Sequence, residues 1–161
     1  MNVDIRRAEI SDIEQVVALW ALLHRTHEAL DQRYKLSSDA PLRWSNDFRE
    51  FVRSDRLRYF VAEADAGKLV GLLVAQAMLP TPLYEPETFV HIDELIVAHD
   101  FRGQGIGERL VHEALRWADE IEAVDVRAGV LASNVESRSF WKRLGGEDYS
   151  VQVIIERGRQ E

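Results

Sequence analysis

The sequence contains no cysteine among its 161 residues. Disulfide bonds, thiolate metal sites and a cysteine nucleophile are therefore excluded. The absence of cysteine does not by itself identify a compartment, and we expect the cytoplasm by default.

Long hydrophobic runs are also missing. The most apolar stretch, residues 69–79, is short and includes Gln76, whereas a membrane-spanning helix needs about 20 consecutive apolar residues. The first eight residues are charged and do not form a secretory leader. The sequence therefore predicts a soluble protein that has no membrane partner.

Positive charge is scarce, because 20 lysines and arginines face 28 aspartates and glutamates, for a net charge of −8. This balance argues against nonspecific binding to nucleic acid, and it is compatible with a cationic acceptor or with ordinary solubility. With 161 residues, 46% of them hydrophobic, the chain can build one sizeable core. We predict a single domain over residues 1–161.

A strand, a turn and a helix follow one another in the middle of the chain. Residues 90–97 are predicted to form a buried strand, residues 98–101 a turn, and Ile106 begins an amphipathic helix. The apolar side of this helix repeats at helical spacing through Ile106, Leu110, Ala114, Trp117 and Ile121.

Three glycines stand at the junction between this strand and this helix, in the run Arg102-Gly103-Gln104-Gly105-Ile106-Gly107. Glycines allow an anion to approach the backbone N–H groups that have no partner at a helix start. The dinucleotide fingerprint is excluded because it needs glycine at Glu108, and the phosphate-binding loop is excluded because no Gly-Lys-Ser/Thr occurs. A tight turn alone also explains glycines, but we predict a pyrophosphate cradle.

The strand ending Asp93-Glu94-Leu95-Ile96-Val97, followed by Arg-x-x-Gly-x-Gly, closely resembles the signature of the GNAT superfamily of acyl-CoA-dependent N-acetyltransferases. A second segment, from Asn134 through Phe140-Trp141 to Leu144-Gly145, resembles the next landmark of that family. Two residues depart from the family pattern. His99 replaces the usual proline after the strand, and Trp141 replaces the common tyrosine.

The resemblance implies an α/β (α+β) fold. The expected sheet is single, mixed and mostly antiparallel, with a central parallel strand pair splayed around acyl-CoA and helices on both faces. It also implies acetyl-CoA as cosubstrate and no metal. The cofactor-binding residues that the resemblance indicates are Leu95, Ile96 and Val97 for the pantetheine, Arg102, Gly103, Gln104, Gly105, Ile106 and Gly107 for the pyrophosphate, and Asn134 and Trp141 for the thioester end.

Attack by an alkyl amine requires a base, and the carboxylates nearest the expected attack point are Asp93 and Glu94. We rank Asp93 first, Glu94 second and His91 third. Alternation places His91 and Asp93 on one strand face and Glu94 on the other, unless a β-bulge changes the parity. Either acid could instead pair with a basic side chain on the sheet surface.

A metal site was also considered, because His24 and His27 lie one helical turn apart and could act with Glu28 or Asp31. A histidine pair without further clustered donors is far more common than a ligand pair, so we predict no metal.

The other elements are predicted from periodicity and from helix and turn signals. Before the central strand they are a strand over 3–7, a long helix begun by a capping box of Ser11 and Glu14, a helix over 42–53, a hairpin of 58–64 and 68–78, and a proline-rich loop through Pro80, Pro82 and Pro86. After the central helix they are a strand over 124–130 parallel to 90–97, a helix from Ser133 to Gly145, and a strand over 149–156 that closes the sheet. The apolar stripe of the first helix is expected at Ile13, Val16, Val17, Trp20, Leu23 and Leu30.

The leading functional prediction is an acetyl-CoA-dependent N-acetyltransferase that moves an acetyl group to the amine of a small molecule by direct attack in a ternary complex. A protein N-terminal or lysine acetyltransferase is the alternative substrate class. A noncatalytic acyl-CoA-binding module is the alternative from another functional class. Open strand edges at both ends of the sheet are compatible with a homodimer.

Overall fold

The computed structural model describes residues 2–85 and 87–158. Two compact units divide the chain, residues 1–129 and residues 130–161. The first unit contains the whole sheet and most of the helices, and the second contains one helix and the C-terminal segment. The prediction of a single domain stays a prediction.

Five strands form one sheet in the order β1-β2-β3-β4-β5. Neighbouring strands are antiparallel except for β4 and β5, which are parallel. This sheet confirms the predicted mixed, mostly antiparallel fold. The strands are β1 (Asp4–Arg7), β2 (Leu57–Ala64), β3 (Lys68–Met78), β4 (Phe89–Val97) and β5 (Val126–Ala128).

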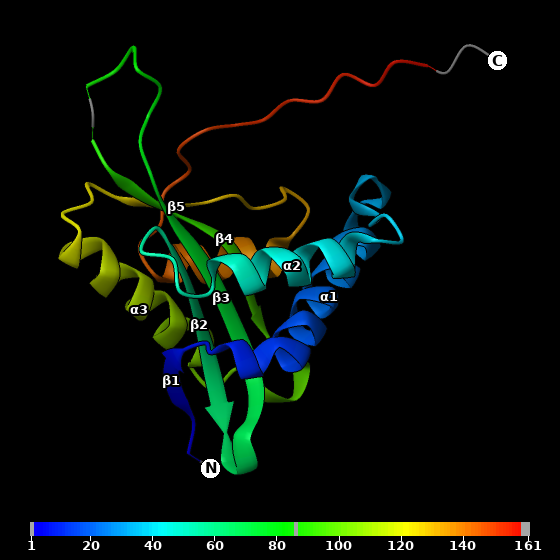
Figure 1. Cartoon of the computed structure of the whole chain (residues 1–161). Helices are drawn as coiled ribbons and strands as arrows, with labels where there is room; N and C mark the ends of the chain where they lie inside the picture. The colour runs from blue at the N-terminus through cyan, green and yellow to red at the C-terminus, as the bar shows by residue number, and fades with distance from the viewer. Residues whose placement is uncertain (1, 86, 159–161) are drawn as a thin grey trace. The chain divides into compact units, whose positions relative to one another are not determined.

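Helices cover both faces of this sheet (Figure 1). On one face, α1 (Ile13–Leu30) and α2 (Ala40–Phe51) enclose a core to which β3 contributes Leu72 and Val74. On the other face lies α3 (Ile106–Glu120), whose Leu110 contacts the backbone of Gly71. A Cβ atom at Gly71 would lie 3.0 Å from Leu110 Cδ1, so the absence of a side chain there lets α3 pack closely.

The start of α1 differs from the prediction. A 3₁₀ turn, Ile10–Asp12, precedes the helix, and the carboxylate of Asp12 accepts a hydrogen bond of 2.7 Å from the backbone N–H of Glu9. The capping box of Ser11 and Glu14 is therefore wrong. Arg6 also donates two hydrogen bonds to the Asp12 carboxylate. These charged hydrogen bonds hold the side chain of Asp12, the last residue of the turn, in place.

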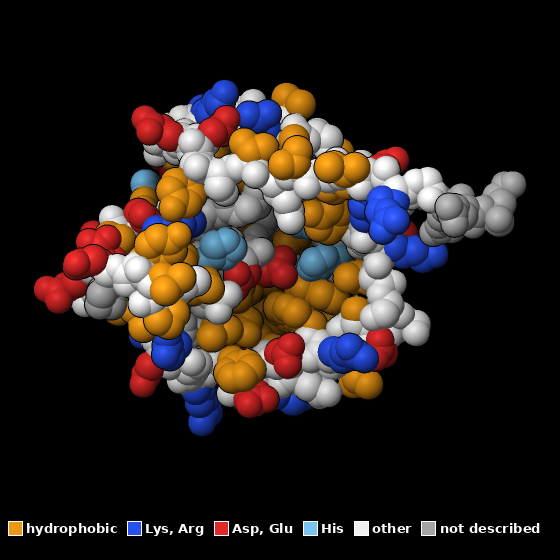
Figure 2. All heavy atoms as spheres, turned by 90° about the horizontal axis from the view of Figure 1, so that it is seen from above, with side chains coloured by type: hydrophobic (Ala, Val, Ile, Leu, Met, Phe, Trp, Pro, Cys, Tyr) orange, Lys and Arg blue, Asp and Glu red, His pale blue; other side chains and the backbone are white. Residues whose placement is uncertain are grey.

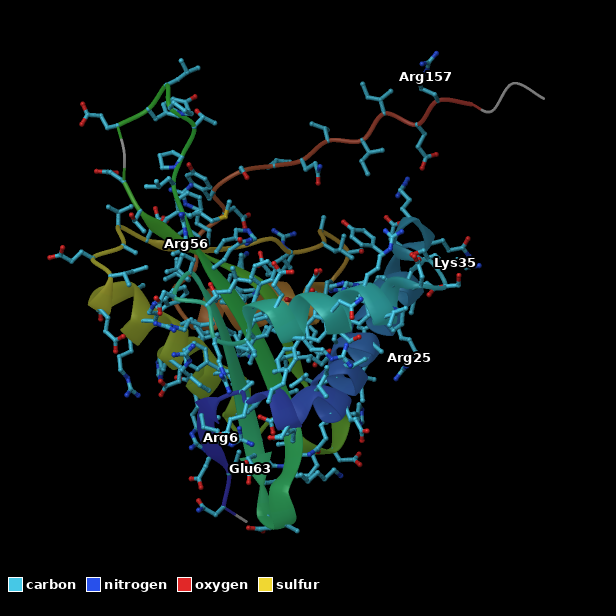
Figure 3. All side chains as sticks on the ribbon, in the orientation of Figure 1. Arg6, Arg25, Lys35, Arg56, Glu63 and Arg157 are labelled. Carbon is cyan, nitrogen blue, oxygen red and sulfur yellow. The ribbon has the colours of Figure 1, made fainter. Side chains whose placement is uncertain are left out.

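Arg6 of β1 forms ion pairs with carboxylates of two other segments. Its guanidinium pairs with Asp12 and with Glu63 of β2, and Figure 3 shows Arg6 and Glu63 labelled on adjacent strands. The hydrogen bond from Arg6 lowers the pKa of Asp12 below its ordinary value, against an opposing effect of burial.

The buried side of α1 is Val16, Leu19, Trp20 and Leu23. Leu19 was missing from the predicted stripe, and Leu30 at the helix end is 40% exposed. The helix before Gly145 is α4 (Val135–Arg143), and its N-cap is Asn134 in place of the predicted Ser133. The side chain of Asn134 accepts a hydrogen bond of 3.0 Å from Ser137 N, and amide oxygens serve this role well.

The predicted closing strand over 149–156 is wrong, since this segment has no regular structure. Its apolar residues are exposed, as at Val151 and Val153 (both 84%) and Ile155 (88%). The alternation of apolar and polar residues predicted a strand. Alternation shows which side chains would share one face of a strand, but it does not show that a neighbouring strand is available for pairing. Of the loop prolines, Pro80 and Pro82 lie outside helices and strands, and Pro86 lies outside the described residues.

Within residues 2–85 and 87–158, none of the helices has the length and apolar character needed to cross a membrane.

Candidate active site

A β-bulge in β4 controls the geometry of the two candidate acids. Val74 of β3 pairs with Glu94, but the next residue, Ala75, pairs with Ile92, so Asp93 is an extra residue in the ladder. Two consecutive residues at such a bulge direct their side chains to the same side of the sheet. Asp93 and Glu94 therefore both lie on the face covered by α1 and α2, and simple alternation does not apply.

Glu94 is held by two side chains from α1. Trp20 Nε1 donates a hydrogen bond of 3.2 Å to Glu94 Oε1, and His24 Nε2 lies 3.4 Å from the same oxygen. The carboxylate side chain is only 14% exposed. Glu94 thus lies beside the middle of α1, half-buried and directed toward the helix.

Asp93 has a different set of partners. Its Oδ1 lies 2.8 Å from His91 Nδ1 and accepts a hydrogen bond of 3.1 Å from Gln76 Nε2. Its side chain is 30% exposed, about twice the value for Glu94. His91, the third candidate base, is therefore a partner of Asp93. Neither acid is paired with a lysine or an arginine in the described part of the chain.

Aromatic rings surround the Glu94 side. The ring centroids of His24 and Trp20 are 4.5 Å apart, Trp20 stacks on Trp44 at 5.2 Å, and His24 lies 5.5 Å from His27. Figure 2 shows histidine and acidic side chains gathered near the centre of one face, with hydrophobic side chains around them. Burial, and then the neighbouring His24, lower the pKa of His27, so His27 is neutral near pH 7.

The pair His24 and His27 does not recruit the further ligands that a metal site needs. Among the residues that the structure describes, no three His, Asp or Glu side chains form a group that could hold a metal ion.

Tyr59 of β2 also lies on this face, and no motif in the sequence points to it. It pairs with Val74 in the sheet and is 3% exposed. Burial, with smaller effects of Asp47, Asp93 and Glu94, raises the pKa of Tyr59 to about 12. Tyr59 is therefore a neutral phenol throughout the physiological range.

The edge of β4 opens beyond Ile92. The parallel pairing with β5 covers only Val90 to Ile92, so among the described residues no strand pairs with Glu94 to Val97 on that side. Ala98 N donates to Val70 O, which directs the backbone groups of residue 98, and by alternation those of Ile96, toward β3. The backbone groups of Leu95 and Val97 therefore face the open edge. The predicted parallel pair is present, over three residue pairs.

The glycine loop follows this edge directly. Gly103 and Gly105 have φ angles of +72° and +75°, a region that favours glycine. Gly105 is the N-cap of α3, no side chain caps the helix there, and a Cβ on either glycine would meet nothing within 4 Å. The space beside both glycines is open and the start of α3 has no side-chain cap, an arrangement that suits an anion. The Arg102 side chain turns back, and its Nε donates to Val97 O at 3.0 Å.

Two predicted cofactor residues lie in the second unit. Asn134 caps α4, as described above. Trp141 lies in α4 beside Phe140, with ring centroids 5.2 Å apart, and its carbonyl accepts a hydrogen bond from Gly146 N. These contacts account for helix capping and helix termination. Roles for Asn134 and Trp141 toward acetyl-CoA stay predictions.

The family model of the acetyltransferase (GNAT) family matches residues 17–146, which include α1, the bulge and the glycine loop. The chain belongs to this family. It is an acyltransferase by that membership, and the resemblance drawn from its two motifs is confirmed.

Three relatives share most of the chain. An uncharacterized N-acetyltransferase of Archaeoglobus fulgidus is 30% identical, with 86% of this chain and 88% of the relative covered. The peptidyl-lysine N-acetyltransferase YjaB of Salmonella typhimurium is 27% identical, with 90% and 83% covered. An uncharacterized N-acetyltransferase of Methanocaldococcus jannaschii is 28% identical over 91% of this chain, which spans only 62% of that relative.

Solved structures confirm the fold. A tetramutant of the BH1408 protein from Bacillus halodurans superimposes with a TM-score of 0.87 at 19% identity, covering 96% of this chain and 99% of that one. The aminoglycoside acetyltransferase AAC(6')-Iy, solved with a bisubstrate analog, CoA-S-monomethyl-acetylneamine, gives 0.74 at 23% identity, covering 99% and 100%.

Proposed function

We propose that this protein is an acetyl-CoA-dependent N-acetyltransferase that acts on the amine of a small molecule. The observation that carries the proposal is the bulge at Asp93. This bulge places two carboxylates on one face of β4, while the backbone of the same strand stays open at its edge. Base and acyl donor can therefore meet on a single strand.

Acetyl-CoA is placed by backbone groups in this proposal. The pyrophosphate binds the N–H groups at Gly103 to Gly107, where the dipole of α3 is positive. The pantetheine runs along the open edge and bonds to Leu95 and Val97, with Ile96 supporting the strand between them. The thioester carbonyl needs a backbone N–H donor on this strand: the N–H of Leu95 faces the open edge, whereas that of Ile96 faces β3. Leu95 N–H is therefore the proposed oxyanion donor.

The reaction is a direct transfer. The neutral amine nitrogen attacks the thioester carbon, the C–S bond breaks, and CoA leaves as a thiolate. The nitrogen gives up its proton to a carboxylate, Glu94 or Asp93, and the thiolate takes a proton from solvent or leaves ionised. No covalent acyl-enzyme forms, so the main contribution of the protein is to hold the two reactants together.

The acceptor class follows from charge. Asp93 and Glu94 have only neutral or imidazole partners, so a cationic amine is attracted to them before it loses its proton. The structural neighbour AAC(6')-Iy, named for an aminoglycoside acceptor, is compatible with a small-molecule amine. A lysine side chain is the second candidate, because the relative YjaB is named a peptidyl-lysine N-acetyltransferase. Cytoplasmic location and a homodimer stay predictions.

An acceptor screen tests the proposal. Release of free CoA thiol from acetyl-CoA is measured with polyamines, amino acids, aminoglycosides and a lysine peptide, using the wild type and the variants Glu94→Gln and Asp93→Asn. We expect turnover with a small amine and a loss of kcat of roughly a hundredfold in the variant that lacks the base. Binding of CoA without turnover of any amine would favour the noncatalytic module. Turnover of the peptide alone would favour a protein acceptor.

A further inference from the structure

We infer that Trp20 and His24 are positioning residues that hold the carboxylate of Glu94 for proton removal, and that they make Glu94, in preference to Asp93, the base. This inference rests on the proposed function. It also reverses the ranking predicted from the sequence, in which Asp93 came before Glu94.

The two contacts converge on one oxygen. Trp20 Nε1 and His24 Nε2 both meet Glu94 Oε1, and Glu94 Oε2 has no partner among the described residues. The terminal torsion of a glutamate is broad, so a free carboxylate samples many orientations. Two contacts on Oε1 restrict this torsion and leave Oε2 as the oxygen that accepts the proton.

The helix makes this positioning rigid. Trp20 and His24 are four residues apart in α1, so both side chains lie on the same helix face. Trp20 is 4% exposed and stacks on Trp44, and Trp20 and His24 are themselves in ring contact. The donor atoms are therefore fixed by packing, as a positioning shell requires.

Asp93 lacks such support. Its partners, His91 and Gln76, belong to the strands β4 and β3, and its side chain is more exposed than that of Glu94. A more exposed acid remains better solvated and is held less precisely. We assign Asp93 to attraction of the cationic acceptor and not to proton removal.

Other titratable groups interact with Glu94 or with its neighbours. His27 on α1 and Tyr59 on β2 feel the charge of Glu94, Asp47 on α2 and Asp93 act on Tyr59, and His91 pairs with Asp93. Near pH 7 His27 and Tyr59 are neutral, for the reasons given above. The simpler explanation of the contacts is that Glu94 only satisfies a buried indole N–H. If this simpler explanation holds, replacing Trp20 lowers the stability of the protein, and any change in kcat is the same whether residue 94 is Glu or Gln.

A kinetic double-mutant cycle distinguishes these explanations. Trp20→Phe and His24→Phe each remove a contact to Glu94 and keep a ring. We expect each to lower kcat by roughly tenfold or more at saturating substrates, with KM for acetyl-CoA unchanged, and to have no further effect in a Glu94→Gln background. The matched control is Trp117→Phe, which replaces a buried indole of α3, on the other face of the sheet from Glu94, and which should keep kcat within about twofold.

Additive losses, or single variants as active as Trp117→Phe, would overturn the inference. A silent Glu94→Gln beside a damaging Asp93→Asn would overturn the base assignment. Should Trp20→Phe fail to fold, His24→Phe carries the cycle, because His24 is more exposed.

A measurement without turnover separates failure of this inference from failure of the proposed function. In ¹⁵N-labelled protein, Glu94→Gln should move the Trp20 indole N–H signal, because a neutral amide accepts a weaker hydrogen bond than a carboxylate. Asp93→Asn should leave that signal in place. An unmoved signal in Glu94→Gln would refute the contact on which the inference depends. The expected pattern together with no turnover of any amine would refute the proposed function instead.

Discussion

Trp20 Nε1 donates a hydrogen bond of 3.2 Å to Glu94 Oε1, although the two residues are 74 positions apart in the chain. This contact joins the first helix to the fourth strand at the bulge. It shows why α1 is part of the candidate site as well as part of the core: the same helix face that buries Val16 presents two side chains to a carboxylate.

The glycine loop can be tested by one charged substitution. Gly105→Glu should abolish CoA binding, because its carboxylate would occupy the open space next to the first N–H groups of α3. Gly105→Ala is the matched control, since it shares the cost of a residue at φ +75° but adds no charge. Calorimetric titration with CoA measures both. Equal affinities of the two variants would show that the loop does not hold the pyrophosphate.

Asp12 should stabilise the fold in a pH-dependent manner. The hydrogen bond from Arg6 lowers the pKa of Asp12 in the folded protein. Its contribution to the free energy of unfolding is therefore fully present above the pKa of the unfolded chain, near 4, and is lost as the pH falls through the lower pKa of the folded protein. Asp12→Asn should reduce the free energy of unfolding by roughly 1 to 3 kcal/mol at pH 7. Urea unfolding at pH 7 and at pH 3 provides the comparison. A deficit of the same size at both pH values would contradict the assignment.

Tyr59 should make the protein sensitive to alkali. Its pKa is raised to about 12 in the folded state, against about 10 in the unfolded chain. The unfolded state therefore loses the proton first, and the free energy of unfolding falls between those pH values by about 1.4 kcal/mol per pH unit. The Tyr59→Phe variant should lack this alkaline fall in the free energy of unfolding. The measurement is denaturant unfolding at pH 9 and pH 11, and parallel losses in both proteins would refute the prediction.

Trp141 stands where many family members present a phenol. An indole N–H is too weak an acid to protonate a departing thiolate, and a thiolate whose thiol has a pKa of about 8.5 is a tolerable leaving group without help. Trp141→Phe should therefore cost less than about tenfold in kcat. Trp141→Ala, which removes far more volume, should cost more and raise KM for acetyl-CoA. A loss beyond roughly a hundredfold in the Phe variant, with binding intact, would give the indole N–H a part in the chemical step.

Much of the architecture could be predicted from local patterns. The hairpin around residues 65–67, the strand from which Glu94 projects and the helix from Ile106 all follow from periodicity and turn signals, because these depend on nearby residues. The glycine loop could be predicted for the same reason. A backbone that needs positive φ at Gly103 and Gly105, next to an uncapped helix start, is encoded within a few positions.

The geometry of the candidate site was decided by tertiary structure. A bulge arises from the register between β3 and β4, and no pattern within β4 states that Asp93 is the extra residue. The contacts of Trp20 and His24 to Glu94 depend on how α1 packs on the sheet, and a helical stripe indicates only that Trp20 is buried. The segment 149–156 shows the same limit, since its alternation predicted a strand and the described structure has no strand there. Local sequence thus determined the elements and the loop, while the side chains that meet across them were set by long-range packing.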